Sequence, residues 1–115
     1  MNVRGLYDTA QHKDKWGKIR ILMQQTGADF AVLTETHVSR GNEIWGLEGA
    51  AISYAPYKGS FKGVAVLPLS NKCSVKKIWE AGGRALKCDI SVSGEPALRL
   101  GALYAPATES HLHLD

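Results

Sequence analysis

The residue of this chain best placed to do chemistry is Glu35. It follows the apolar run Phe30–Leu33, where a buried strand turns polar at Thr34. A rigid strand fixes such a side chain while its tip stays accessible. With His37 two residues on, the carboxylate could hold a hard cation such as Mg²⁺ through oxygen. The alternative is a surface acid that ends a strand, and residue type alone favours that alternative.

Tyr104 is the second candidate, in Leu103-Tyr104-Ala105-Pro106. The proline cannot continue a central ladder, so Tyr104 lies at a strand end. Its phenol can donate to a phosphate oxygen, and a half-buried core tyrosine is an equally good interpretation. His111 and His113 form a weak metal motif, because no further His or Cys accompanies them.

A helix and a series of strands position these residues. Lys13–Gln25 is the predicted helix, with Gly27 ending it. Its apolar residues recur at helical spacing: Trp16, Ile19, Leu22 and Met23. After the buried strand before Glu35, strands are predicted over 50–55, 63–67, 74–79, 84–92 and 97–105, the last two forming a hairpin. The polar–apolar alternation makes Cys88 a small buried residue. An extended segment over Asn2–Leu6 precedes the helix, and the buried strand before Glu35 follows it. This order of strand, helix and strand predicts packed α and β layers.

Composition excludes several classes of protein. The chain has 115 residues, 44% of them hydrophobic, which argues for one globular domain. It has no apolar run of about 20 residues, so no membrane span is expected. Two cysteines cannot form a disulfide framework, and an intracellular location, the nucleus included, is expected. Seven basic residues and one acid lie between Lys58 and Lys87, a local charge of +6. They could contact phosphates or simply solvate strand ends and loops, and the second interpretation is slightly favoured.

Several short motifs follow one another over nearly the whole chain. They are Asn2-Val3-Arg4-Gly5-Leu6, the helix opening at Lys15-Trp16, Gly27-Ala28-Asp29, Val32-Leu33-Thr34-Glu35-Thr36-His37, Gly63-Val64-Ala65-Val66-Leu67, Gly83-Arg84-Ala85-Leu86 and Leu103-Tyr104-Ala105-Pro106. Taken in this order, they resemble the endonuclease/exonuclease/phosphatase family, and most of all the endonuclease domains of non-LTR retroelements. Each motif is weak alone, and their order makes the resemblance specific.

The resemblance implies an α+β fold of two facing, mainly antiparallel sheets flanked by helices, and Mg²⁺-dependent cleavage of phosphodiester bonds, with Mn²⁺ as another possible ion. By position, Glu35 matches the principal metal-binding glutamate and Asn2 the asparagine near the metal and the phosphate. Tyr104 matches the tyrosine that contacts the scissile phosphate. DNA is the expected partner, with Arg4, Lys58, Lys62 and Arg84 as candidate phosphate contacts.

The chain also departs from the family pattern. The strand before Asn2 is missing, and the later Asp-x-Asn motif and closing Asp-His pair do not occur. We therefore expect residues 1–115 to be a single incomplete domain, an α/β/β/α sandwich with an apolar sheet face left uncovered, and inactive alone. The missing half or a larger polyprotein would be its partner. Two alternatives stay open: a non-catalytic nucleic-acid-binding remnant, and a phosphoinositide or sphingolipid phosphoesterase of the same family.

Overall fold

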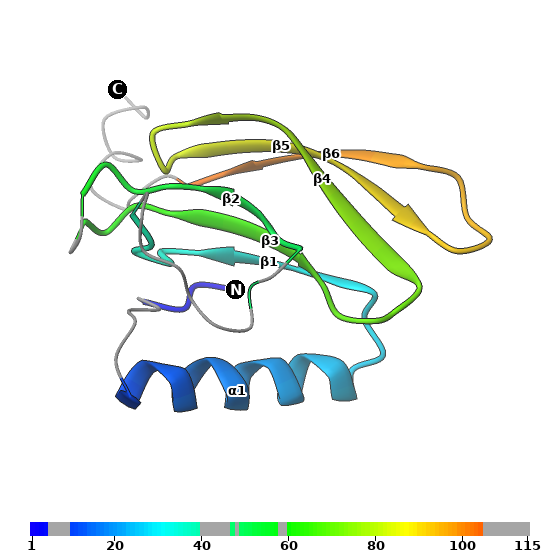
Figure 1. Ribbon diagram of the computed structural model, residues 1–115, viewed down its shortest axis with the longest axis horizontal. Coiled ribbons are helices and arrows are strands. Elements are labelled where there is room, and N and C mark those ends of the chain that lie inside the picture. Colours follow the sequence, from blue (N-terminus) through cyan, green and yellow to red (C-terminus); the bar gives the residue numbers. More distant parts are fainter. Residues whose placement is uncertain (5–9, 40–46, 48, 58–59, 105–115) are drawn as a thin grey trace, which may run out of the picture.

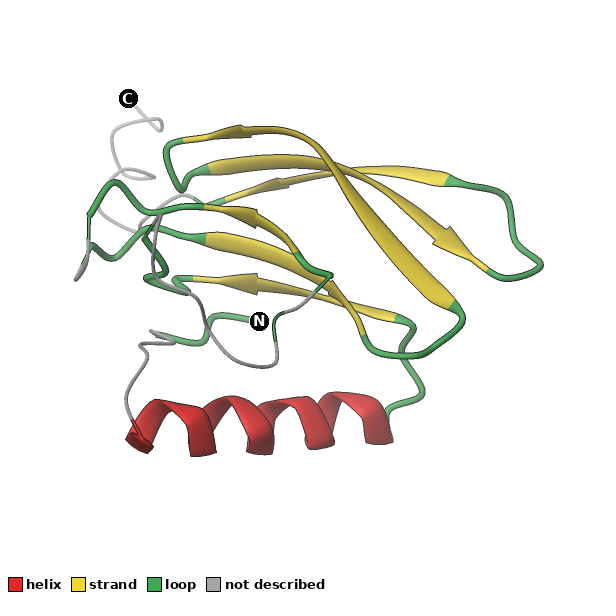
Figure 2. Cartoon of the chain, viewed as in Figure 1, coloured by secondary structure: helices red, strands yellow, loops and turns green. Residues whose placement is uncertain are grey.

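The computed structural model describes residues 1–4, 10–39, 47, 49–57 and 60–104. One helix and six strands follow one another in this part of the chain. They are α1 (Ala10–Gln25), β1 (Phe30–Thr34), β2 (Ala51–Ser53), β3 (Val64–Pro68), β4 (Cys73–Ala81), β5 (Ala85–Val92) and β6 (Leu98–Leu103). The strands form two antiparallel three-stranded sheets, in the orders β1-β3-β2 and β4-β5-β6 (Figures 1 and 2).

The elements stack in three layers: helix, first sheet, second sheet (Figure 1). The face of the first sheet that carries Ala31, Leu33 and Leu67 packs with Trp16 of α1 in one hydrophobic cluster. Its opposite face carries Val64 and Val66, which pack with Leu86, Cys88 and Ile90 of the second sheet. Successive side chains of a strand point to opposite faces, so both faces of β1 are covered, as its continuous apolar run predicts. The expected α+β sandwich is therefore the observed fold.

Helix α1 begins three residues before the predicted start and ends where predicted. Its termination is local: Gly27 has φ of 79°, and its amide donates to the Gln24 carbonyl at 3.1 Å. Trp16 is buried, and Ile19 and Met23 pack against the same cluster. The prediction that Leu22 shares this face is wrong, because Leu22 lies on the exposed side of the helix. Six residues after Trp16 is about 240° around the wheel, away from the sheet.

The second sheet has an alternation that a bulge interrupts. In β5, Leu86, Cys88 and Ile90 are buried against the first sheet, as predicted. In β4 the register shifts between Lys77 and Trp79, so that Trp79 pairs with Lys87 and Glu80 with Leu86. Residues paired across a ladder share a face, so the extra residue sends Trp79 to the outer face and Glu80 toward the first sheet. The Tyr54 amide then donates to Glu80 Oε2 at 2.9 Å, which ties β4 to the chain just after β2.

The outer face of the second sheet has no cover among the described residues. Trp79 and Leu103 are its strongly exposed apolar side chains in the described residues. The sequence predicted an uncovered apolar sheet face. The outer face of the second sheet is uncovered in the described residues, but it is only partly apolar. Lys76, Asp89 and Arg99 lie across the same face as a charged ladder. No helix in the described part of the chain combines the length and apolar character needed to cross a membrane.

Candidate functional site

Glu35 and Tyr104 are in direct contact. The Tyr104 hydroxyl donates to Glu35 Oε1 at 2.7 Å, between residues 69 positions apart in the sequence, and the bond is partly buried. Glu35 follows the last residue of β1, and Tyr104 follows the last residue of β6. Both strands run toward the same end of the molecule, so the two sheets bring their terminal side chains together there (Figure 1). The sequence predicted each residue at a strand end, and the fold joins them.

The backbone around Glu35 is held in an unusual conformation. Glu35 and His37 have φ of 55° and 59°, the left-handed region that costs a non-glycine residue about 1 to 3 kcal/mol. Hydrogen bonds and burial compensate for this strain. The Thr36 amide donates to the Gly63 carbonyl at 3.2 Å and the His37 amide to the Lys62 carbonyl at 3.0 Å. Thr36 is 0% and His37 6% exposed. The segment is fixed by its neighbours, and of its three residues Glu35 is the one that is partly exposed.

Two glycines make the close approach possible. A Cβ on Gly63 would lie 2.3 Å from Thr36 Oγ1, and a Cβ on Gly83 would lie 2.9 Å from the Cα of Ala55. The Gly63 amide donates to the Gly83 carbonyl at 2.8 Å, which links the first sheet to the β4–β5 turn. In the sequence, Gly83 stands out only as part of a short motif and Gly63 only as the first residue of a predicted strand. The residues around Gly63 and Gly83 in the sequence give no sign that these two glycines pack against the backbone of distant segments.

Asn2 lies beside the strand that carries Glu35. Residues 1–3 pair with β1: the Val3 amide donates to the Thr34 carbonyl at 2.9 Å, and the Thr34 amide donates to the Met1 carbonyl at 2.7 Å. This places Asn2 opposite Thr34 in a parallel bridge, and Thr34 is the residue immediately before Glu35. Its side-chain oxygen accepts the Arg4 amide at 3.1 Å, so the amide group is oriented by a local turn.

Three of the four predicted phosphate contacts lie in the described part of the chain, at the same end of the molecule as Glu35. The Arg84 carbonyl accepts the Tyr104 amide at 2.7 Å, and the Lys62 carbonyl accepts the His37 amide at 3.0 Å, so both residues belong to this end of the molecule. Arg4 is exposed near Asn2. Lys58, His111 and His113 lie outside the described residues.

The other described lysines of the basic stretch are spread over the surface. Lys76 pairs in register with Asp89, on the outer face of the second sheet. Lys77 forms an ion pair with Glu80 at 3.3 Å. The local charge of +6 therefore does not form one basic patch around Glu35.

The donors at this site fit a weakly held hard cation. Mg²⁺ keeps several waters and needs only one or two protein carboxylates. Glu35 supplies one carboxylate, and the Tyr104 hydroxyl holds one of its oxygens in place. Asn2, on the segment paired with Thr34, has an amide oxygen that accepts the Arg4 amide and keeps a second lone pair. Within the described ranges, no three His, Cys, Asp or Glu side chains are close enough together to hold a metal by themselves. The site is thus suited to an ion shared with a bound phosphate.

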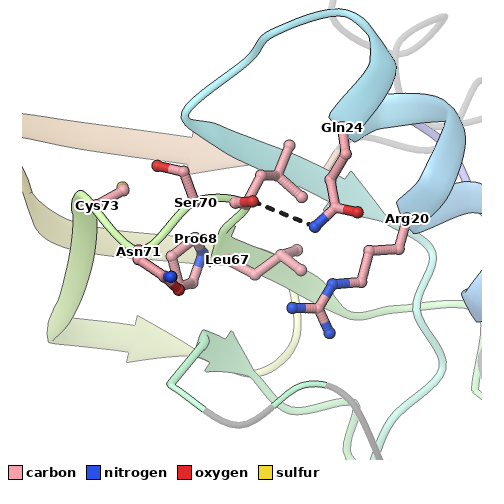
Figure 3. Close-up of a pocket in the computed structure, with 8 residues that line it drawn as sticks. Arg20, Gln24, Leu67, Pro68, Ser70, Asn71 and Cys73 are labelled. Atoms are coloured by element: carbon pink, nitrogen blue, oxygen red, sulfur yellow. Dashed lines mark hydrogen bonds between the residues drawn. The ribbon is translucent and has the colours of Figure 1, made fainter.

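A second concavity lies at the opposite end of the molecule. This cavity of about 290 Å³ lies between α1 and the β3–β4 connection, with Arg20, Gln24, Leu69, Ser70 and Asn71 among its lining residues (Figure 3). Gln24 Nε2 donates to the Leu69 carbonyl at 3.2 Å and so joins the helix to the connection. Burial raises the pKa of the Cys73 thiol at its edge, and the nearby Asp29 adds to this rise. None of the predicted site residues lines this cavity.

Comparison with known proteins adds no relative. No protein-family model matches the chain, and no curated protein is significantly similar to it. The resemblance to the endonuclease/exonuclease/phosphatase family therefore stays a prediction, and it rests on the ordered motifs of the sequence.

Proposed function

We propose that this chain provides the metal- and phosphate-binding part of a Mg²⁺-dependent endonuclease that cleaves phosphodiester bonds in nucleic acid, with DNA as the favoured substrate. The observation that carries the proposal is the 2.7 Å hydrogen bond between Tyr104 and Glu35, which pairs a phenol with a carboxylate at the common end of the two sheets. These are the residue types that a phosphate and its cation require.

Each side chain has a distinct part in this proposal. Glu35, helped by the amide oxygen of Asn2, holds Mg²⁺ or Mn²⁺. When bound, such an ion polarises the phosphoryl oxygen and neutralises charge on the leaving oxygen. Tyr104 donates its single hydroxyl hydrogen to the Glu35 carboxylate and so orients it. Donation to the phosphate as negative charge builds there would replace this bond. Arg84 and Lys62 lie on the segments that flank the pair, where cations steer a polyanion toward it.

Turnover needs more than this set of residues. A group must take the proton from the attacking water, and the chain has no Asp-x-Asn motif to orient it. We therefore propose that these residues bind metal and phosphate, and that cleavage requires groups from a further segment or a partner.

Metal binding is the direct test. Titration of Mn²⁺, followed by the electron paramagnetic resonance signal of the free ion, should show one saturable site. Glu35→Gln should abolish that site, because the amide lacks the charge. Tyr104→Phe should weaken it about tenfold, the usual effect of losing a hydrogen bond that orients a ligand. Glu95→Gln, an exposed acid in the β5–β6 connection, is the matched control and should bind as the parent does. Equal Mn²⁺ binding by the Glu35 and Glu95 variants would overturn the assignment of Glu35.

Nicking of supercoiled plasmid with Mg²⁺ tests the limit on turnover. The chain alone should leave the plasmid supercoiled over hours at micromolar protein. Robust nicking that is lost in Glu35→Gln would establish the enzyme but refute the requirement for further groups. Nicking that survives this substitution would point to a contaminating nuclease. The non-catalytic alternative predicts salt-dependent DNA binding that is unchanged in Glu35→Ala.

A further inference from the structure

Two exposed aromatic side chains lie beside the Glu35 segment. Tyr57 is 70% and Phe61 72% exposed, although each is a large ring that would normally be at least half covered. Lys62 follows Phe61 directly, and its carbonyl accepts the His37 amide at 3.0 Å. Ala55, two residues before Tyr57, donates its amide to the Val38 carbonyl at 2.8 Å. The backbone at Tyr57 and at Phe61–Lys62 therefore lies close to the segment that follows Glu35, and the metal and phosphate site does not use the two rings.

Hydrogen bonds hold the described residues on either side of Phe61 in place. The Ser60 amide donates to the Tyr57 carbonyl at 3.1 Å, and the Ser60 hydroxyl accepts the Lys62 amide at 3.3 Å. Ser60 itself is buried. The ring of Phe61 meets the buried ring of His37 edge to face, with centroids 5.5 Å apart and planes at 88°. Phe61 is thus supported from inside while most of its surface faces water.

An aromatic face next to a cation is what single-stranded nucleic acid recognises. Unpaired bases stack on aromatic side chains, and the neighbouring phosphates contact Lys and Arg. We propose that Tyr57 and Phe61 form a stacking platform for unpaired bases of the strand whose phosphate lies at Glu35 and Tyr104. The platform rests on the proposed function and narrows its substrate to single-stranded or locally opened nucleic acid.

A lipid surface is the competing occupant, and the local chemistry favours a base. Insertion into a bilayer requires a continuous apolar face. Here the residues between the two rings include the buried Ser60, whose polar groups hold the turn, and Lys62 follows the second ring. Two exposed aromatic rings, with a lysine directly after the second in the sequence, suit planar bases on a phosphate backbone better than acyl chains.

The test measures binding without turnover. Fluorescence anisotropy of a labelled oligothymidine of about a dozen nucleotides, in EDTA, is compared with a duplex of the same length. The parent chain should prefer the single strand. Phe61→Ala should weaken single-strand binding about tenfold, as expected from the loss of one stacked base, and Phe61→Tyr should retain it. Trp79→Ala, an exposed aromatic on the outer face of the second sheet, is the matched control and should bind as the parent does.

Salt dependence separates stacking from charge. Lys62→Ala should reduce the slope of log affinity against log salt by about one, whereas Phe61→Ala should lower affinity at every salt concentration with the slope unchanged. Equal binding of single strand and duplex, or unchanged binding by Phe61→Ala, would overturn the platform. So would tighter binding to phosphatidylserine vesicles than to the oligonucleotide.

The Mn²⁺ titration keeps this proposal distinct from the previous one. Glu35→Gln should lose the metal and still bind the single strand in EDTA. A parent chain that binds Mn²⁺ but shows no preference for single strands would leave the metal site intact and remove the platform. A parent chain that binds single strands through Phe61 but never binds Mn²⁺ would keep the stacking platform and remove the metal site.

Discussion

The two sheets of this molecule differ in how many of their faces are covered. In the first sheet, the helix covers one face and the second sheet covers the other, so Val64 to Leu67 of β3 are all buried. In the second sheet only the inner face is packed, and Cys73 is the only fully buried residue of β4. The Glu35–Tyr104 bond joins the two, with its carboxylate on the fully covered sheet and its phenol on the half-covered one.

The difference indicates where stability and adaptability reside. A carboxylate that binds a metal, as we propose for Glu35, must be held in a fixed position, and the covered sheet with its strained, buried continuation provides that. The half-covered sheet contributes a side chain that only needs to reach the carboxylate. We infer that the first sheet determines the geometry of the site and that the second sheet closes it.

The largest expected effect compares one leucine from each sheet. Leu33 of β1 is 0% exposed, and Leu103 of β6 is 79% exposed. Leu33→Ala should lower the free energy of unfolding by about 2 to 5 kcal/mol, because it removes buried methyl groups and leaves a cavity. Leu103→Ala should change it by less than about 0.5 kcal/mol. Urea unfolding followed by circular dichroism gives both values. A similar loss in the two variants would contradict the difference between the sheets.

The joint between the sheets is the next point to test. Gly63→Ala would place a Cβ 2.3 Å from Thr36 Oγ1 and 2.9 Å from the His37 amide nitrogen, at φ of 128°. We expect a loss of roughly 2 to 4 kcal/mol from strain and overpacking together. Gly101→Ala is the control, because nothing lies within 4 Å of its Cβ position. If the two alanine variants unfold at the same urea concentration, the close approach at Gly63 does not constrain the fold.

The smallest expected effect concerns the outer face of the second sheet. Arg99 Nε donates to Asp89 Oδ1 at 2.8 Å and a second guanidinium nitrogen to Oδ2 at 3.1 Å. These hydrogen bonds, with the charge of Arg99, lower the pKa of Asp89 from its ordinary value. A lowered folded-state pKa adds stability above the unfolded value of about 3.9, and this contribution disappears as pH falls through the folded-state pKa.

Asp89→Asn should therefore lower the melting temperature slightly at neutral pH and not at all in strong acid. Added salt should reduce the small neutral-pH difference, because both side chains are exposed. Melting curves of the parent and the variant at both pH values, with and without salt, measure this. A difference that persists in acid would show that Asp89 acts through something other than its charge.

Local patterns predicted most of the elements. The β5 alternation and the Gly27 helix end are properties of neighbouring residues, and both are confirmed. The sequence also identified Glu35 and Tyr104 as strand-end residues, from the polar switch at Thr34 and from Pro106. Their contact could not be predicted from composition or spacing, because it depends on how two sheets dock across 69 positions of sequence.

The features that sequence reasoning missed are those set by distant neighbours. The bulge at Ile78 breaks an otherwise plausible strand pattern, and no residue type in β4 signals it. The left-handed backbone at Glu35 and His37 is imposed by hydrogen bonds to Lys62 and Gly63. Leu22 was assigned to the wrong helix face because 16, 19, 22 and 23 span more of the wheel than the sheet covers.

The order of strands has a consequence for how the chain folds. The second sheet is a meander of successive hairpins, which form within about 1 to 10 μs in small peptides. The first sheet pairs Thr34 with Val64, thirty positions further along the chain, and inserts β3 between β1 and β2. Non-local pairing is the slower event, since loop-closure entropy must be overcome first. We expect the strands leading to Tyr104 to assemble early and the Glu35 carboxylate to reach its place last, so that the proposed binding of a metal ion would report the final docking step.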